Sequence, residues 1–159
     1  MRRIFLTVIT LSQLFGALVV FSFFDASLKQ TPFSTLGLAQ KAVFGVSVLI
    51  YLLGLIGSIL IWLSRSAGIW LSLIHQLLLT PVFIIAGVFF WVLGDAISVA
   101  VVVWWTAGGP SLNVLFNVGT GNLLQVMQPI AGVSYFGANI FALICAVYLN
   151  RLRRDEIFA

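Results

Sequence analysis

The stretch Ala42–Leu63 reads AVFGVSVLIYLLGLIGSILIWL and contains no Asp, Glu, Lys, Arg or His. An α-helix rises about 1.5 Å per residue, and the hydrocarbon core of a bilayer is about 30 Å thick. Roughly 20 consecutive apolar residues are therefore enough to cross it. The stretch meets this length, so it predicts a membrane-spanning helix.

Three other apolar runs have a similar length: residues 4–24, 69–93 and 129–149. The chain as a whole is 62% hydrophobic and 8% charged, whereas a typical soluble domain has roughly 25% charged residues. We therefore expect an all-α integral membrane protein, in which a single domain, residues 1–159, forms a bundle of four transmembrane helices.

The first run follows Met1, Arg2 and Arg3, and so resembles a secretory signal. Signal cores usually span roughly 7 to 15 residues and end at a small-x-small cleavage site. The first run is longer and no such site follows at Asp25, so we expect a retained first span. Residues 25–41 are rich in Ser, Thr, Gln and Gly, and we expect an irregular outer loop there.

The connection at residues 64–68 is short, so the helices on either side of it should be antiparallel neighbours. The third run contains Thr80-Pro81. A proline inside a helix removes one backbone hydrogen bond, which predicts a kink near that position.

Charged residues indicate the orientation of the chain. With four crossings, the lysines of the outer side are Lys29 and Lys41, and the opposite side carries six arginines: Arg2, Arg3, Arg65, Arg151, Arg153 and Arg154. Excess Arg and Lys in short loops marks the cytoplasmic side, which predicts that both termini are cytoplasmic. No Asn-x-Ser/Thr site occurs, and Cys145 is the sole cysteine. These absences favour the bacterial inner (plasma) membrane. The chain also has no block of basic and aromatic residues, so we expect no nucleic-acid partner.

Between the third and fourth runs, residues 97–118 have the pattern of two strands. Ile97, Val99, Val101 and Val103 belong to a β-branched run in which they alternate with residues 98, 100, 102 and 104. A turn-forming segment follows at residues 106–110, and apolar residues then recur at every second position. This period of two predicts an extracytoplasmic β-hairpin. A competing interpretation extends the third helix to Trp105 and places Asp95 inside the membrane, which would be costly.

The hairpin has an apolar face that needs to be covered, because isolated hairpins are marginally stable. The expected interface residues are Trp104, Trp105, Leu112, Val114, Phe116 and Val118. The loop at residues 25–41, the membrane surface, a second copy or a partner protein could cover it. We expect a protein interface, with other membrane-protein subunits or copies of the chain as partners besides the lipid bilayer.

A few polar residues lie within the apolar runs and form a possible intramembrane site: Gln13, His75, Gln76 and Asn139. The expected role is to hydrogen-bond across helices, with a proton or substrate path as the alternative. Small residues at intervals of four predict close helix packing: Gly54 and Ser58, and Ala138, Ala142 and Ala146.

The sequence provides little for catalysis. It has no phosphate-binding loop, zinc-ligand spacing or nucleophile elbow, and we expect no catalytic residues, metal or cofactor. The leading hypothesis is a non-enzymatic accessory, scaffolding or self-assembling subunit of a membrane complex. A small channel or transporter using Gln13, His75 and Gln76 is the alternative, and a membrane enzyme or haem-binding subunit is the third.

Overall fold

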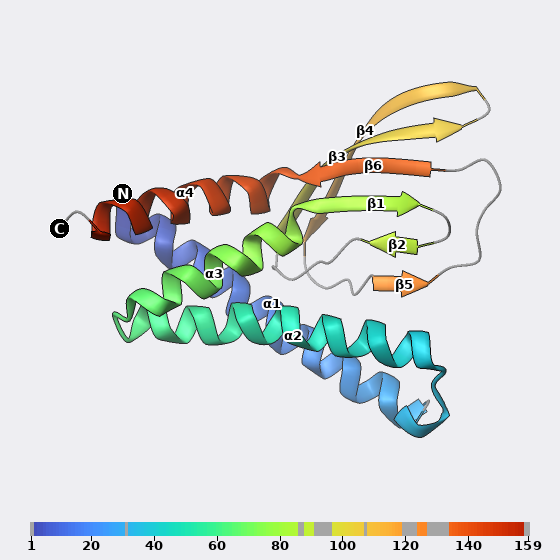
Figure 1. Ribbon diagram of the computed structural model, residues 1–159, viewed down its shortest axis with the longest axis horizontal. Coiled ribbons are helices and arrows are strands. Elements are labelled where there is room, and N and C mark those ends of the chain that lie inside the picture. The colour runs from blue at the N-terminus through green and yellow to red at the C-terminus, as the bar shows by residue number, and fades with distance from the viewer. Residues whose placement is uncertain are drawn as a thin grey trace.

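The protein has a mixed α/β fold rather than the predicted all-α bundle (Figure 1). The computed structural model describes residues 2–30, 32–85, 88–90, 97–106, 108–118, 124–126 and 134–157. Its helices are α1 (Arg2–Gln30), the 3-10 turn η1 (Phe33–Thr35), α2 (Leu38–Trp62), α3 (Ser66–Leu79) and α4 (Ile140–Ile157). Its strands are β1 (Pro81–Ile85), β2 (Val88–Phe90), β3 (Ile97–Thr106), β4 (Gly109–Val118), β5 (Leu124–Val126) and β6 (Ser134–Asn139).

The strands form one antiparallel sheet in the order β4-β3-β6-β1-β2-β5. Two of them continue directly from helices: β1 follows α3, and β6 leads into α4 (Figure 1). The two helix–strand junctions are adjacent, because the backbone N–H of Asn139 donates to the carbonyl of Thr80 (2.8 Å). The two junctions therefore lie side by side at the boundary between the helices and the sheet.

The predicted third span, residues 69–93, is wrong. The helix ends at Leu79, and strand β1 begins at Pro81. Proline lacks the N–H that would continue the helix and is tolerated at the first position of a strand, so the chain changes structure there instead of kinking. The β-branched Val82, Ile84 and Ile85 then favour the extended backbone.

The predicted fourth span, residues 129–149, is also wrong. Residues 134–139 form β6, and α4 begins at Ile140. A Cβ atom at Gly137 would overlap the carbonyl oxygen of Val101 on the neighbouring strand, so the bare glycine permits this close strand pairing. Hydropathy alone did not separate a buried strand from a membrane helix, because both are apolar runs.

The predicted hairpin is present. Ile97 pairs with Val118 and Thr106 with Gly109, so the strands cover the expected residues 97–118. It is not a separate appendage of a helical bundle, since β3 also pairs with β6. The expected outer loop at residues 25–41 is shorter than predicted, because α1 continues to Gln30 and α2 begins at Leu38. Asp95, which the competing interpretation placed in the membrane, lies outside the described residues.

Two helices of the described chain have the length and composition of membrane spans: α1, over Arg3–Ser22, and α2, over Phe44–Trp62. The other apolar helix, α3, has 14 residues, about 21 Å at 1.5 Å per residue. The prediction of four transmembrane helices is therefore incorrect, and the structure supports two candidate spans.

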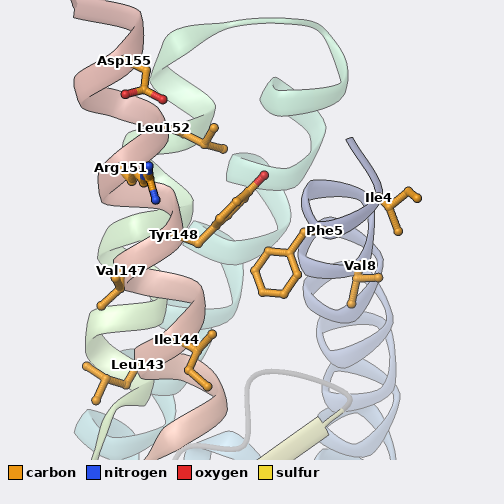
Figure 2. A pocket seen from close by; sticks show the side chains of 10 residues that line it. All are labelled: Ile4, Phe5, Val8, Leu143, Ile144, Val147, Tyr148, Arg151, Leu152 and Asp155. Atoms are coloured by element: carbon orange, nitrogen blue, oxygen red, sulfur yellow. The ribbon is translucent and has the colours of Figure 1, made fainter. Parts of the chain in front are cut away.

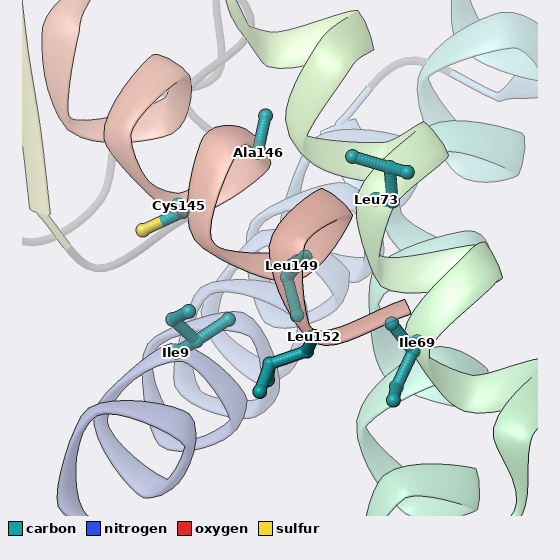
Figure 3. Close-up of a cluster of buried hydrophobic side chains, with 7 residues drawn as sticks. All are labelled: Ile9, Ile69, Leu73, Cys145, Ala146, Leu149 and Leu152. Carbon is teal, nitrogen blue, oxygen red and sulfur yellow. The ribbon is translucent and has the colours of Figure 1, made fainter. Parts of the chain in front are cut away.

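The helices share an apolar core near the two termini (Figure 3). Its buried members come from α1, α3 and α4: Ile9, Ile69, Leu73, Cys145, Ala146, Leu149 and Leu152. A second cluster joins α1 and α2 to the ends of α3 and α4: Val20, Phe24, Ile50, Tyr51, Leu79 and Ala142. These clusters place four helices around one interior.

The turn between α2 and α3 follows a defined helix-ending motif. The N–H of Ser64 donates to the Ile61 carbonyl (2.9 Å), and the N–H of Arg65 donates to the Leu60 carbonyl (2.8 Å). Ser64 adopts φ +55°, the left-handed conformation that a helix end of this kind requires. The motif reverses the chain, so α2 and α3 form the predicted antiparallel pair.

Glycines set the distance between these two helices. A Cβ atom at Gly57 would lie 2.6 Å from Ser72 Oγ and 2.8 Å from the Ser72 backbone nitrogen. One at Gly68 would lie 2.8 Å from the Gly57 carbonyl oxygen. The backbones therefore approach more closely than any larger residue permits.

We predict that Gly57→Ala lowers the free energy of unfolding by about 1–3 kcal/mol, because the added methyl group forces α2 and α3 apart. Gly45→Ala on the same helix is the matched control, since its Cβ would have nothing within 4 Å. The control should be neutral or stabilising, because alanine favours a helix over glycine by about 1 kcal/mol. Equal effects of the two variants on unfolding in mixed micelles would argue against the close α2–α3 contact.

Candidate functional site

In the described part of the chain, several polar side chains are buried beside the apolar clusters, and many large apolar side chains are exposed. Several polar side chains are buried: Thr10, Ser12, Gln13, Ser47, Ser58, Ser72, His75, Gln76, Ser98 and Asn139. Many large apolar side chains on the helices are exposed, among them Ile4, Phe15, Leu18, Leu49, Ile56, Ile59, Trp70, Ile74, Leu77, Ile144 and Val147. A protein that folds in water buries such apolar groups first. Here many of them stay on the surface of the described helices.

Gln13 is at the centre of a polar contact among three helices. Its side chain, on α1, is 1% exposed. Its Oε1 accepts hydrogen bonds from the hydroxyl of Ser58 on α2 (2.7 Å) and from that of Ser72 on α3 (3.1 Å). One acceptor therefore holds α1, α2 and α3 together.

His75 lies on α3, about one helical turn after Ser72, and is 1% exposed. Its Nδ1–H donates to the carbonyl oxygen of Ile50 on α2 (2.8 Å). The ring fits against Gly54, where a Cβ atom would lie 2.7–2.9 Å from three ring atoms. The absence of a side chain at Gly54 thus makes room for the imidazole.

The other two polar residues predicted at depth have different surroundings. Gln76 is fully buried on α3, and its backbone carbonyl accepts from the Thr80 hydroxyl (2.9 Å) where the helix ends. Asn139 is the N-cap of α4, since its Oδ1 accepts from the backbone N–H of Ala142 (3.3 Å). It also accepts from the N–H of Val99 on β3 (3.4 Å). Asn139 therefore fixes the sheet-to-helix junction, which is a structural role.

The three alanines that were predicted to line one helix face in residues 129–149 do not lie on one helix. Ala142 and Ala146 are buried on α4, but Ala138 lies on β6, so the three do not form one helix face. Gly54 faces His75 on α3, and Ser58 donates to Gln13 on α1. Whether these residues drive association between chains stays a prediction.

The predicted interface residues of the hairpin divide between the two faces of the sheet. Trp104 stacks near Tyr135, with ring centroids 5.0 Å apart, beside the buried cluster Val82, Ala100, Val102 and Tyr135. Burial raises the pKa of Tyr135 to about 12, so this phenol stays uncharged at neutral pH. Trp105 is exposed and belongs to the opposite face, and the side chain of Val118 lies outside the described part.

That opposite face is apolar and uncovered over the described strands. Leu112, Val114 and Phe116 are 70%, 66% and 69% exposed. The strand register extends the face across four strands in two rows: Phe83, Phe136, Val103 and Leu112, then Pro81, Ala138, Val101 and Val114. Directly opposed residues of antiparallel strands share a face. Every position in the two rows is apolar.

An open groove of about 890 Å³ lies between α1 and α4 (Figure 2). It is lined by Ile4, Phe5, Val8, Leu143, Ile144, Val147, Tyr148, Arg151, Leu152 and Asp155. The walls are apolar, and the two charged residues come from the last turns of α4. The predicted polar residues Gln13, His75, Gln76 and Asn139 do not line this groove.

Chemistry-bearing groups do not converge in the described part of the chain. No three His, Cys, Asp or Glu side chains among the described residues are placed to hold a metal ion. Cys145 is buried in the apolar cluster near the termini (Figure 3). Asp25 forms an exposed ion pair with Lys29 (2.6 Å). The described geometry therefore assigns no catalytic residue.

Sequence reasoning missed several partners of these residues. Ser72 was not singled out, although it completes the Gln13 contact, and neither was Thr10, which accepts from Trp62 Nε1 (2.9 Å). Isolated Ser and Thr residues occur in many apolar helices, so composition gave no reason to select these two. Their spacing relative to Gln13 becomes meaningful once the helix pairs are known.

Comparison of the chain with protein-family models, with curated proteins and with solved structures gave no match.

We predict that His75→Ala lowers the free energy of unfolding by about 1–2 kcal/mol, through the lost hydrogen bond and the space left beside Gly54. Gly54→Ala alone should also destabilise the protein, since its methyl group would overlap the imidazole. In the double variant the methyl group fills part of the vacated space, so the two losses should not add. Strict additivity in unfolding measurements would show that the two residues are not packed together.

Proposed function

We propose that this chain is a non-enzymatic, membrane-embedded subunit that assembles with copies of itself or with other membrane proteins. The observation that carries the proposal is the large number of exposed apolar side chains on the helices, together with the polar side chains buried between the helices. In a bilayer, exposed apolar groups contact lipid and buried polar groups find partners between helices. The same distribution would be unfavourable in water.

The two candidate spans support this proposal. Only 39% of the apolar window in α1 and 33% of that in α2 is buried. The core helix of a water-soluble protein would be buried over most of its length. Here the larger part of each helix presents apolar side chains outward, as expected of helices that contact lipid.

The charges support an orientation with both termini in the cytoplasm of a bacterial inner membrane. The two termini and the α2–α3 turn lie at one end of the molecule (Figure 1). This end carries the six arginines, whereas Lys29 and Lys41 lie beside the α1–α2 connection at the other end. The positive-inside rule assigns the arginine-rich end to the cytoplasm.

Aromatic residues at the arginine-rich end fit the same orientation. Trp62 and Trp70 are exposed there, and the guanidinium of Arg153 lies 4.2 Å from the ring centroid of Trp70. Tryptophan is enriched where the hydrocarbon meets the headgroups. These residues are well suited to position the arginine-rich end at the membrane surface.

An accessory or scaffolding role fits the described residues better than transport. Gln13, His75 and Gln76 are almost fully buried, and the contacts described for Gln13 and His75 hold helices together. A channel or transporter would need them to line a path. A membrane enzyme or haem-binding subunit stays the third hypothesis, with no group of converging side chains among the described residues to favour it.

Extraction tests the membrane assignment. We expect the full-length protein to sediment with membranes, to remain there after washing with alkaline carbonate, and to dissolve in mild detergent. A peripheral membrane protein of the same cells serves as the control for release by carbonate. Recovery of the folded chain in the carbonate supernatant would refute the proposed function.

The orientation makes a separate prediction. A membrane-impermeant amine reagent added outside intact spheroplasts should modify Lys29 or Lys41, which both lie near the α1–α2 connection. A cysteine introduced by Ser66→Cys, beside Arg65, should stay protected from an impermeant thiol reagent until the membrane is opened. The reverse labelling pattern would show that the charge argument assigns the wrong side.

A further inference from the structure

The two edges of the sheet differ. One edge is β5, a strand of three residues that contacts α2. The other is β4, which has ten residues and pairs with β3 on one side. No described strand pairs with its other side. The backbone groups along this side of β4 are therefore available to another strand.

Strand β4 lacks most of the usual protection against pairing. Natural edge strands are typically short, or carry charged residues, prolines or bulges. Strand β4 has no charged residue, and its one proline, Pro110, lies at the beginning next to the turn. Within hydrocarbon an open sheet edge is not tolerated, and in water it invites association. Both environments favour a partner strand.

The sequence of β4 is symmetric in character about Leu115. Residues 111–119 read SLNVLFNVG. On each side of Leu115, the next residue is apolar, the second is asparagine, the third is apolar and the fourth is small. We propose that β4 pairs antiparallel with β4 of a second copy, with Leu115 opposite the same residue of that copy. The inference rests on the proposed function, and it identifies the self-assembling surface.

The symmetry selects one register. With Leu115 at the centre, Asn113 faces Asn117 of the second copy, Val114 faces Phe116, and Leu112 faces Val118. A two-fold axis at Val114 or at Phe116 instead would place an asparagine opposite Leu115. The centre at Leu115 is the register that matches like with like, because asparagine then lies opposite asparagine and apolar residues lie opposite apolar residues.

This pairing also makes the apolar faces of the two copies continuous. The side chains of Leu112, Val114 and Phe116 from each copy would lie next to those of the other, on one continuous surface. Cross-strand apolar pairs each contribute roughly 0.2–1 kcal/mol. Two sheets would merge into one, and the outer backbone groups of each β4 would gain hydrogen-bond partners. Only at the central pair does a residue lie opposite the same position of the second copy.

Cysteine cross-linking in native membranes tests the register. Opposed residues in an antiparallel pair have Cα atoms about 4.5–5.5 Å apart, within the range that a disulfide requires. Leu115→Cys should therefore form a covalent dimer under mild oxidation, with a doubled mass on a non-reducing gel. Asn113→Cys is the matched control on the same strand and face. In the proposed register, the cysteines introduced at this position in the two copies would be four residues apart along the strand, about 13 Å. It should remain monomeric.

A second measurement tests the same register without Leu115→Cys, in case that variant does not fold. Membranes containing both Val114→Cys and Phe116→Cys chains should yield a cross-linked dimer between the two kinds of chain. The wild-type protein, whose Cys145 is buried, controls for background. Dimers at Leu115→Cys and in the mixed membranes, without dimers at Asn113→Cys, would support the proposal.

Cross-linking that is equal at all positions, or absent at both test positions, would overturn it. Finding the uncross-linked variants in the membrane fraction would leave the proposed function standing, whereas finding them soluble would refute that function as well.

Discussion

The close contact between α2 and α3 is the constraint on which the rest of the structure depends. Gly54, Gly57 and Gly68 allow the two helices to approach until backbone atoms and polar side chains touch. The same contact encloses His75 and Ser72, and through Ser72 it engages Gln13 on α1. In an apolar surrounding these polar groups are stable only when they face one another. The glycines thus bring the polar groups inside and leave the large apolar residues outside.

Two helix–strand junctions connect these helices to the sheet. Helix α3 ends at Thr80-Pro81, helix α4 begins at Asn139, and a backbone hydrogen bond joins the two points. Beyond them, one face of the sheet carries the buried cluster and the other carries the exposed apolar side chains of β4, while the β5 edge contacts α2.

The sequence predicted the local patterns and failed on the helix–strand boundaries. The hairpin at residues 97–118, the antiparallel α2–α3 pair and the apolar character of α1 and α2 all follow from periodicity or run length. The spans at residues 69–93 and 129–149 were wrong because an apolar run of helical length can also hold a helix followed by a buried strand. Pro81 and Gly137 marked the change, but their meaning depended on strand pairing. The contact of Gln13 with two serines was equally invisible without the helix pairs.

Accessibility of spin labels in lipid vesicles shows whether the outward apolar side chains of α1 and α2 contact lipid. Labels at the exposed positions Leu18, Leu49 and Ile56 would be compared with one at Ser34 in the α1–α2 connection. Oxygen concentrates in hydrocarbon, whereas a charged or chelated nickel reagent stays in water. The account predicts high oxygen and low nickel accessibility at the three helix positions, and the opposite at Ser34. High nickel accessibility along both helices would contradict it.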